Sequence, residues 1–525
     1  MISSHHRRRY VPGLRSRYDV IVCGAGSSGS VVAGRLAENP DVSVLLIEAG
    51  GEDTAPSVTD ASLWSTNLGS ERDWGFRALP NAHLNGRSLP MSMGKVLGGG
   101  SAINVMVWAR GHRSDWDLFA AASGDPGWGY DSVLDIYRRV EDWHGASDPQ
   151  YRGTGGPVFV APAQEPSPLA PATVAAAGSL GLPVFDHPNG RMMEGDGGAA
   201  ISDLRARNGK RQSVFGSYVY PYLERPNLTV LTHATVTRVI VEANRVTGVE
   251  IYQQGTTIAV GADVEVVLSL GTVHTPKVLM YSGIGDAAEL NRWGIPVRQH
   301  LPGVGRNFQD HVGISCVWEN RVPLSPRNNS SESTVYWRLS DSENPDVFIC
   351  HVEVPLNSDE TAARFGVPAS GWSLFGGLAH PKSRGRLRLT GSNPLDPIDI
   401  DANTFSDPDD IKTAVRCVEF CREIAYSGPL RPFIRREVMP GDLTGRHLEE
   451  FVRNAAVTYW HQSATAKMGL DSMSVVDGAL RVYGVQNLRI ADASIMPAIT
   501  TGNTMAPCVV IGERAADMVI DAHGL

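Results

Sequence analysis

Residues 18–29 read YDVIVCGAGSSG, an apolar strand that runs directly into the pattern G-x-G-x-x-G. A helical stretch at 30–38 follows, and a second apolar run at 42–47 ends in an acid, Glu48, nineteen residues after the last glycine of the pattern. Strand, glycine turn, helix and acidic residue stand in the order that dinucleotide-binding β-α-β units require. The segment therefore predicts a dinucleotide site, although the pattern alone does not separate NAD from FAD.

Each glycine of this turn has a distinct expected role. Gly24 permits the tight turn, Gly26 lets the backbone approach a pyrophosphate, and Gly29 lets the helix and the strand pack closely. The N-terminus of the helix adds N–H donors and a dipole that favours an anion. We expect Glu48 to accept hydrogen bonds from a ribose hydroxyl. The alternative interpretation is an ordinary glycine-rich turn.

The composition bounds the class of protein. A chain of 525 residues with 42% apolar and 20% charged side chains is long enough for two domains, or for one large domain with insertions. Its formal net charge of −9 argues against a nucleic-acid partner. No apolar run approaches the roughly 20 residues needed to cross a bilayer, so we expect no membrane span and a cytoplasmic location. The basic run HHRRR at 5–9 is interpreted as part of a mobile N-terminal arm at 1–17.

The six cysteines are too sparse to form a disulfide framework. Cys417 and Cys421 lie four residues apart in a predicted helix at 411–426 and share one face. Because no His or Cys nearby completes a ligand set, core packing is the favoured interpretation and no metal site is predicted.

Several later segments also suit a dinucleotide fold. The Gly-, Pro- and Trp-rich stretch 51–113 has at its centre GKVLGGGSAIN (94–104), where backbone can approach a flat ligand; a flexible turn is the alternative. Thr275 and Pro276 are expected to open a helix. Strands are predicted at 228–232, 236–241, 246–252, 264–270 and 488–492, and a helix at 506–522. The two ends of the chain are therefore expected to build one domain, and the middle another.

These motifs resemble a known family. The segment 94–104, with Trp108, Gly111 and Asp117, is similar to the first signature of the glucose-methanol-choline (GMC) flavoprotein oxidoreductases, and GTVHTPKVLMYSGIG (271–285) is similar to the second. The N-terminal glycine pattern, HQSATAKMG at 461–469 and the segment 485–503 resemble further family elements in the same order. The resemblance covers essentially the whole chain after residue 18.

The resemblance implies an α/β fold, with a Rossmann-like FAD-binding domain and an α+β substrate-binding domain. The expected division is an arm at 1–17, FAD-binding parts at 18–160, 223–316 and 461–525, and substrate-domain parts at 161–222 and 317–460. Ile103 stands where some members carry a histidine bonded to the flavin, so we expect non-covalent FAD. The residues implied to contact FAD are Gly24, Gly26, Ser28, Gly29, Glu48, Ala49, Trp74, Gly98, Gly99, Ser101, Asn104, Val107, Val236, Asp492, Ala493, Asn503 and Thr504.

The family's catalytic pair would be His461 and Asn503, with Trp460 beside the substrate. Oxidation of an alcohol requires loss of a hydroxyl proton and of a hydride from the same carbon, and a flavin can accept the hydride. A neutral imidazole near its reference pKa of about 6.5 is a suitable proton acceptor. Asn503 cannot act as a base, so we expect it to orient the substrate oxygen by hydrogen bonding.

The substrate is expected to be a neutral aromatic, furanic or simple primary alcohol, oxidised to the aldehyde. Choline-oxidising members have a glutamate where this chain has Val312 and Gly313, so choline loses its main electrostatic partner, although Trp460 offers a cation–π face. The electron acceptor is O2 or a quinone-type carrier. The alternatives are a choline-type dehydrogenase, a flavin-binding lyase of the same fold, and a nicotinamide-dependent dehydrogenase, which would not need the second glycine segment.

Overall fold

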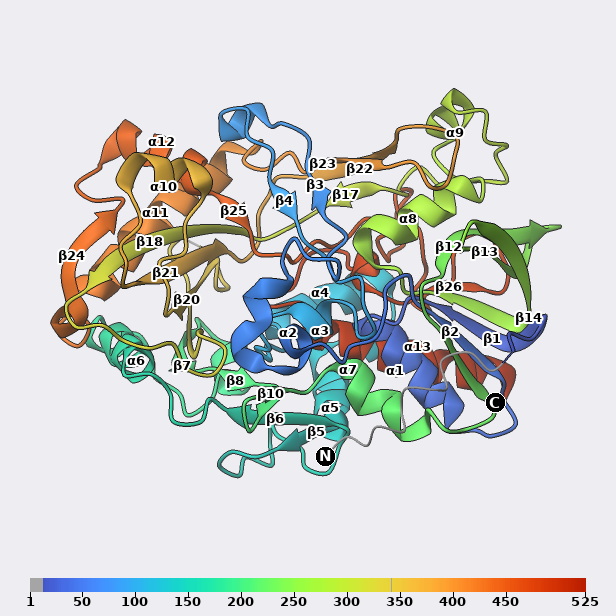
Figure 1. Cartoon of the computed structure of the whole chain (residues 1–525), viewed down its shortest axis with the longest axis horizontal. Coiled ribbons are helices and arrows are strands. Elements are labelled where there is room, and N and C mark those ends of the chain that lie inside the picture. Colours follow the sequence, from blue (N-terminus) through green and yellow to red (C-terminus); the bar gives the residue numbers. More distant parts are fainter. Residues whose placement is uncertain (1–12, 341) are drawn as a thin grey trace.

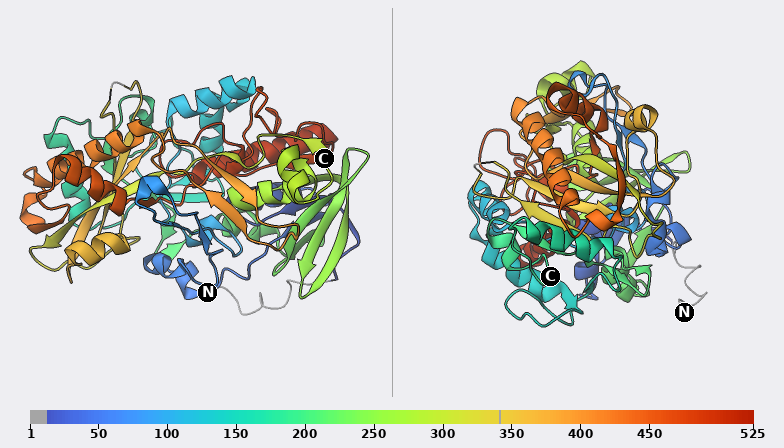
Figure 2. Two further views of the ribbon diagram at one scale, coloured as in Figure 1. Left: turned by 90° about the horizontal axis from the view of Figure 1, so that it is seen from above. Right: turned by 90° about the vertical axis from the view of Figure 1, so that its left-hand side faces the viewer.

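The computed structural model describes residues 13–340 and 342–525. Two seven-stranded sheets organise this part of the chain, one at the right and one at the left of Figure 1. Seen from above, the sheets lie towards opposite ends of an elongated molecule, with helices and loops between them (Figure 2). The basic run at 5–9 lies outside the described residues.

The first sheet is built around β1. Its central strands run parallel, and such strands need crossover connections, which helices and loops provide here. The β12–β13–β14 meander is antiparallel. In spatial order the strands are β11 (Leu228–Leu231), β2 (Val44–Ile47), β1 (Arg17–Cys23), β14 (Thr256–Leu268), β13 (Arg245–Gln253) and β12 (Thr235–Glu242), with β26 (Leu488–Ile490) also on β14. The apolar strands β1 and β2 are almost fully buried, as their sequences predict.

Helices α1 (Ser27–Ala37) and α13 (Met505–His523) pack against each other although they come from opposite ends of the chain. Ser28 Oγ donates a hydrogen bond of 2.7 Å to the carbonyl of Cys508. The buried carboxylate of Glu513 pairs with Arg35 and with Arg139, the latter at 2.9 Å. Both ends of the chain therefore complete one layered unit, with β26 beside β14.

Helix α8 (Gly271–Tyr281) starts earlier than the sequence predicts. Thr275 and Pro276 lie inside it rather than at its first turn. Proline has no N–H, so it leaves the carbonyl of Thr272 without its helical partner. The hydroxyl of Thr465 donates to that carbonyl at 2.6 Å, and this contact from another segment makes the interior proline acceptable.

The second sheet is antiparallel. Its strands are, in spatial order, β24 (Ile434–Met439), β18 (Val312–Asn320), β21 (Gly371–Leu378), β20 (Val347–Val352), β19 (Ser333–Trp337) and β7 (Gly198–Ile201), with β25 (Val457–Thr458) also on β18. Helix α11 (Pro408–Tyr426) packs on β21. Both Cys417 and Cys421 are buried there against Gly376, which agrees with their interpretation as core residues.

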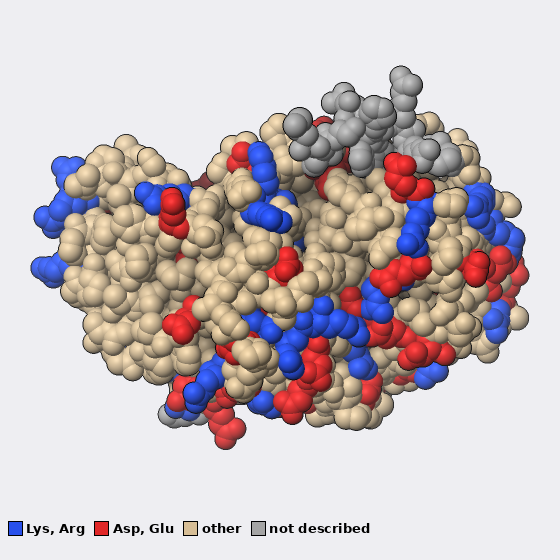
Figure 3. Space-filling model, turned by 90° about the horizontal axis from the view of Figure 1, so that it is seen from below, with Lys and Arg blue, Asp and Glu red and all other residues tan. Residues whose placement is uncertain are grey.

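Further helices cover these sheets and connect the two halves. They are α3 (Gly100–Ile103), α4 (Arg113–Ser123), α5 (Tyr130–Val140), α6 (Leu169–Ser179), α7 (Val214–Tyr218), α9 (Ala287–Arg292), α10 (Asp359–Phe365) and α12 (Gly445–Ala455). None of the described helices is both long and apolar enough to span a membrane. On the face drawn in Figure 3, acidic and basic side chains are interspersed rather than gathered by sign.

Candidate active site

A cavity of about 570 Å³ lies between the two sheets. At one end it is lined by the glycine turn after β1 and by Glu48, and at the other by His461 and the aromatic ring of Phe375. Cavities at the carboxyl ends of parallel strands are the usual ligand sites of open α/β sheets. The arrangement therefore offers one elongated site with two chemically different ends.

Glu48 is held in place at the first end of the cavity. One carboxylate oxygen accepts from the N–H of Ala25 at 3.0 Å, and the other accepts from the N–H of Gly50 at 2.9 Å. Burial raises the pKa of Glu48 to about 7. Because each oxygen can accept more than one hydrogen bond, the carboxylate can still accept from a ribose hydroxyl.

The glycines at this end are of two kinds: some border open space, and others are in close contact with neighbouring backbone. A Cβ added to Gly26 would meet nothing within 4 Å, so this turn leaves room for a ligand. A Cβ on Gly29 would lie 1.9 Å from the carbonyl oxygen of Gly24, so Gly29 serves helix–strand packing. Gly99 has a φ of +51°, and its Cβ would lie 2.7 Å from Cα of Gly26. The two glycine segments are thus packed on each other, which disfavours the flexible-turn interpretation of 94–104.

Most residues expected from the sequence line the cavity. Three do not: Gly29, Gly98 and Ser101. Ser101 is fully buried, where its hydroxyl donates to the carbonyl of Gly98 at 2.7 Å and accepts from the N–H of Val214 at 3.1 Å. Gly29, in α1, therefore serves packing, and Gly98 and Ser101 shape the second glycine segment behind the wall. The expected residues that do line the cavity are Gly24, Gly26, Ser28, Glu48, Ala49, Trp74, Gly99, Asn104, Val107, Val236, Trp460, His461, Asp492, Ala493, Asn503 and Thr504.

His461 and Asn503 meet at the second end of the cavity. The Asn503 amide nitrogen lies 3.1 Å from Nε2 of His461. The backbone N–H of His461 donates to Asp310 at 2.9 Å, and Thr458 donates to the same carboxylate. Burial lowers the pKa of His461 to about 3, well below the ordinary histidine value of about 6.5. The ring is therefore neutral at physiological pH.

The residue before His461 has an unusual backbone conformation. Trp460 has a φ of +60°, which is strained for a bulky side chain. Its N–H donates to Thr458 Oγ1 at 2.7 Å, and that hydroxyl is held by Asp310. This turn places both the indole of Trp460 and the imidazole of His461 on the cavity wall.

A second histidine, His311, stands behind His461 and was not assigned a role from the sequence. Its Nδ1 lies 2.9 Å from Nδ1 of His461, and its Nε2 lies 3.0 Å from the carbonyl oxygen of Ala379. Its ring is fully buried. The available signal was its place directly before Val312 and Gly313, the two positions compared with the glutamate of choline-oxidising proteins.

The wall at this end is apolar and aromatic. It includes the side chains of Val352, Leu356, Phe375, Tyr459 and Trp460. Among the described lining residues the carboxylates are Glu48 and Asp492, and neither belongs to this wall segment. A Cβ on Gly313 would lie 2.2 Å from the ring of Phe375, so β18 has no room for a larger side chain at that position.

One cluster of possible metal ligands lies outside this site. Glu332, His351 and Glu353 are buried with their ligand atoms within 4.8 Å of one another. The N–H of Ser333 donates to Nδ1 of His351 at 3.1 Å, so the neutral ring carries its proton on Nε2, which lies 3.4 Å from Glu353. Burial lowers the pKa of His351 to about 4. The hydrogen bonds of this histidine leave no free nitrogen lone pair for a metal ion.

Together the fold and the cavity define the class of dinucleotide-binding proteins. The chain belongs to the GMC oxidoreductase family: the family's N-terminal model matches residues 18–313, and its C-terminal model matches residues 381–512. This confirms the resemblance stated from the sequence motifs. The family members bind FAD, and the open space at Gly26 with the buried acceptor Glu48 fits that cofactor.

Similar proteins extend over nearly the whole chain. An oxygen-dependent choline dehydrogenase of Brucella suis biovar 1 (strain 1330) is 35% identical over 96% of this chain and 95% of its own length. An alcohol dehydrogenase (acceptor) of Pseudomonas putida is 34% identical over 96% of both chains. The crystal structure of pyridoxine 4-oxidase from Mesorbium loti superposes with a TM-score of 0.90, at 34% identity over 95% of this chain and 98% of that one. The chain is thus an FAD-dependent oxidoreductase that acts on CH–OH groups.

Proposed function

We propose that this protein oxidises a neutral primary alcohol to the aldehyde, with His461 as the proton acceptor. The observation that carries this proposal is the contact between Nε2 of His461 and the amide of Asn503, at the cavity end with the apolar and aromatic wall. FAD, when bound, supplies the hydride acceptor. The chain's own residues bind the alcohol, orient its oxygen and remove its proton.

Asn503 and His461 can divide the two hydrogen bonds of a hydroxyl group. Nε2 of a neutral imidazole has a single lone pair, so it cannot accept from Asn503 and from a substrate at once. A hydroxyl between them would donate to Nε2 and accept from the Asn503 amide. This arrangement binds the alcohol oxygen and selects the proton that is removed.

The low pKa of His461 limits the order of events. With water's pKa of about 15.7 as a stand-in for an alcohol, the gap to a pKa of about 3 is roughly 13 units, or about 17 kcal/mol. Formation of a free alkoxide is therefore too unfavourable to be a separate step. The proton must therefore leave for His461 as the carbon loses its hydride, with the Asn503 N–H stabilising the developing charge on oxygen.

The wall of the cavity supports a neutral substrate. A quaternary ammonium in this space would face Phe375, Tyr459 and Trp460 but no carboxylate of that wall. Choline remains the second candidate, favoured by the 35% identity to choline dehydrogenases and by the cation–π faces of these rings. A lyase is less well supported, because the site retains both His461 and Asn503.

Three finer points stay predictions. Ile103 lines the cavity in place of a linking histidine, so FAD should be released in full when the protein is denatured in acid. The electron acceptor is O2 or a quinone-type carrier. The cytoplasmic location rests on sequence composition alone.

The test is anaerobic reduction of the FAD-loaded protein by a panel of alcohols. Benzyl alcohol, furfuryl alcohol, pyridoxine, ethanol and choline are added in turn, and bleaching of the flavin bands is followed by absorbance. The neutral ring-bearing alcohols should bleach the flavin fastest, and readmitted air then reports whether O2 is the acceptor. Faster bleaching by choline would favour the second candidate, and no bleaching by any alcohol would overturn the proposal.

A further inference from the structure

We propose that His311 is a positioning residue that fixes the tautomer of His461, so that the lone pair of His461 lies on Nε2 and faces the cavity. The inference rests on the proposed role of His461 as the proton acceptor. It goes further by naming what makes that nitrogen the basic one. Three contacts link a backbone carbonyl to the substrate end of the cavity.

The first contact is between His311 and Ala379. A carbonyl oxygen can only accept a hydrogen bond, so Nε2 of His311, 3.0 Å from the Ala379 oxygen, must carry a proton. Ala379 follows β21 directly, and its own N–H donates to the carbonyl of Asp346 at 2.8 Å. The acceptor is therefore part of a hydrogen-bonded backbone, in place whether or not a substrate is bound.

The second contact is between the two rings. With its proton on Nε2, a neutral His311 has its lone pair on Nδ1. Burial and the neighbouring His461 hold the pKa of His311 well below its ordinary value, so the ring is neutral. Since Nδ1 of His311 can only accept, the proton in the 2.9 Å contact belongs to Nδ1 of His461.

The third contact is at the cavity. A neutral His461 that is protonated on Nδ1 has its lone pair on Nε2. This nitrogen lies 3.1 Å from the Asn503 amide, a donor, which agrees with the same assignment. One backbone carbonyl thus decides the position of a proton two rings away. Among the described residues, the hydrogen-bond partner of Nδ1 of His461 is His311.

A neutral partner has a different consequence from a charged one. A catalytic base is often oriented by a third group, and a carboxylate in that position would also stabilise the protonated base. His311 selects the tautomer without adding negative charge behind the ring. The opposite tautomer would place a donor at the cavity and could not take the substrate proton.

Two substitutions separate this role from packing. His311→Asn keeps an acceptor, because Oδ1 of Asn is as many bonds from Cβ as Nδ1 of His, whereas His311→Leu has a branched side chain with no acceptor. We expect the limiting rate of anaerobic flavin reduction to fall about tenfold or more for His311→Leu, and to stay within about threefold of wild type for His311→Asn. FAD content should be unchanged in both.

Equal rates in the two variants would overturn the inference, because packing alone would then explain any loss. A second measurement does not depend on activity. In the wild-type, FAD-loaded protein with ¹⁵N-labelled histidine, the signals of His461 are assigned by their loss in His461→Gln. Nδ1 should show the NMR shift of a protonated nitrogen and Nε2 that of an unprotonated one, and the reverse pattern would refute the inference.

These outcomes are distinct from failure of the proposed function. If His461→Gln reduces its flavin at the wild-type rate, then His461 is not the proton acceptor and the proposed function falls. The tautomer measured by NMR would still report on the three contacts. If His461→Gln is inactive but both His311 variants are equal to wild type, only the inference about His311 falls.

Discussion

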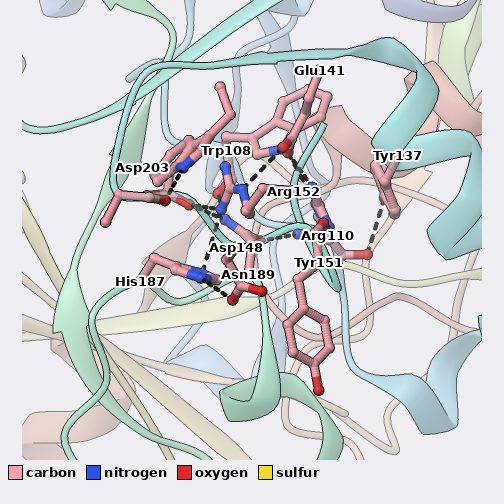
Figure 4. A network of polar contacts seen from close by, with 12 residues as sticks. Trp108, Arg110, Tyr137, Glu141, Asp148, Tyr151, Arg152, His187, Asn189 and Asp203 are labelled. Carbon is pink, nitrogen blue, oxygen red and sulfur yellow. Dashed lines mark hydrogen bonds and ion pairs between the residues drawn. The ribbon is translucent and has the colours of Figure 1, made fainter. Parts of the chain in front are cut away.

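Two buried polar clusters of this molecule differ in charge: one consists of paired ionised side chains, and the other consists of two histidine rings. In the ionic cluster of Arg110, Glu141, Arg152 and Asp203, two arginines face two carboxylates, and each side chain is at most 5% exposed (Figure 4). Glu141 bridges the two arginines with contacts of 2.6 and 3.0 Å, and Arg152 reaches Asp203 at 2.6 Å. The pair of His311 and His461 is also buried, at 0% and 7% exposure, and burial lowers the pKa of both rings, which favours their neutral forms.

The ionic cluster positions backbone. Trp108 donates from its indole to Glu141 at 2.6 Å and from its N–H to the carbonyl of Asp203 at 2.8 Å. Asn189 donates to the carbonyl of Trp108 at 2.8 Å. These contacts hold the segment that brings Asn104 and Val107 to the cavity wall.

The comparison shows two ways to bury polar groups. Buried opposite charges stabilise each other. Removing one partner leaves the other charge buried without compensation, which destabilises the fold. Neutral rings need fewer partners, so one of them can end in a lone pair that remains available to a substrate. The ionic cluster fixes the position of backbone segments, whereas the histidine pair is available for the proposed proton transfer.

The largest expected effect comes from unbalancing the ionic cluster. Glu141→Gln leaves two buried arginines with less compensation, and we expect a loss of about 3–5 kcal/mol in the free energy of unfolding. Urea unfolding measures this loss. The control is Glu71→Gln, whose carboxylate pairs with Arg72 at 80% exposure and should change stability by less than about 0.5 kcal/mol. Similar losses in both variants would contradict the role of the ionic cluster.

A substitution in the histidine pair should reduce activity strongly and stability little. His461→Ala removes the proposed proton acceptor, and the rate of anaerobic flavin reduction should fall by about 10²- to 10⁴-fold. FAD should stay bound, and the melting temperature should change far less than in Glu141→Gln. Stopped-flow absorbance gives the rate. A reduction rate near that of wild type would show that another group takes the proton.

Two glycines of the first turn should also differ, one in its effect on cofactor binding and the other in its effect on stability. Gly26→Ala directs a methyl group into the open space of the cavity, and FAD should bind about ten- to hundredfold more weakly while the fold persists. Gly29→Ala would place Cβ against the Gly24 carbonyl and should destabilise the fold itself. Flavin content and thermal unfolding of the apoprotein separate the two outcomes. A destabilised Gly26→Ala apoprotein would contradict the assignment of free space.

The smallest effect is expected from pH. As the proposed base, His461 must be neutral, so activity should be complete above its pKa and should be lost as the pH falls through it. With a pKa of about 3, the rate of flavin reduction should change less than about twofold between pH 8 and 5. A base with an ordinary pKa of about 6.5 would lose roughly thirtyfold at pH 5. That larger loss would show that the ring is less buried with FAD in place.

Local patterns predicted much of the fold. The strand, glycine turn and acid at 18–48 follow from spacing within thirty residues, and the helix expected at 411–426 is observed as α11. Helix α8 was placed too late, because the hydroxyl that satisfies Thr272 comes from Thr465, 193 residues away along the chain. Ser101 lies in a motif that was expected to contact the cofactor, and its hydroxyl is hydrogen-bonded to Gly98 and to Val214, which is 113 residues away along the chain.

The sequence by itself determined the dinucleotide fold, the family, the cofactor and the likeness of His461 and Asn503 to a catalytic pair, because these depend on motifs whose spacing is local. The tertiary structure alone decided which nitrogen of His461 is basic. That choice depends on His311, 150 residues away, and on the Ala379 carbonyl, 68 residues beyond His311. Hydrogen bonds between distant segments assign protons to particular atoms, and no local pattern of residue types contains that information.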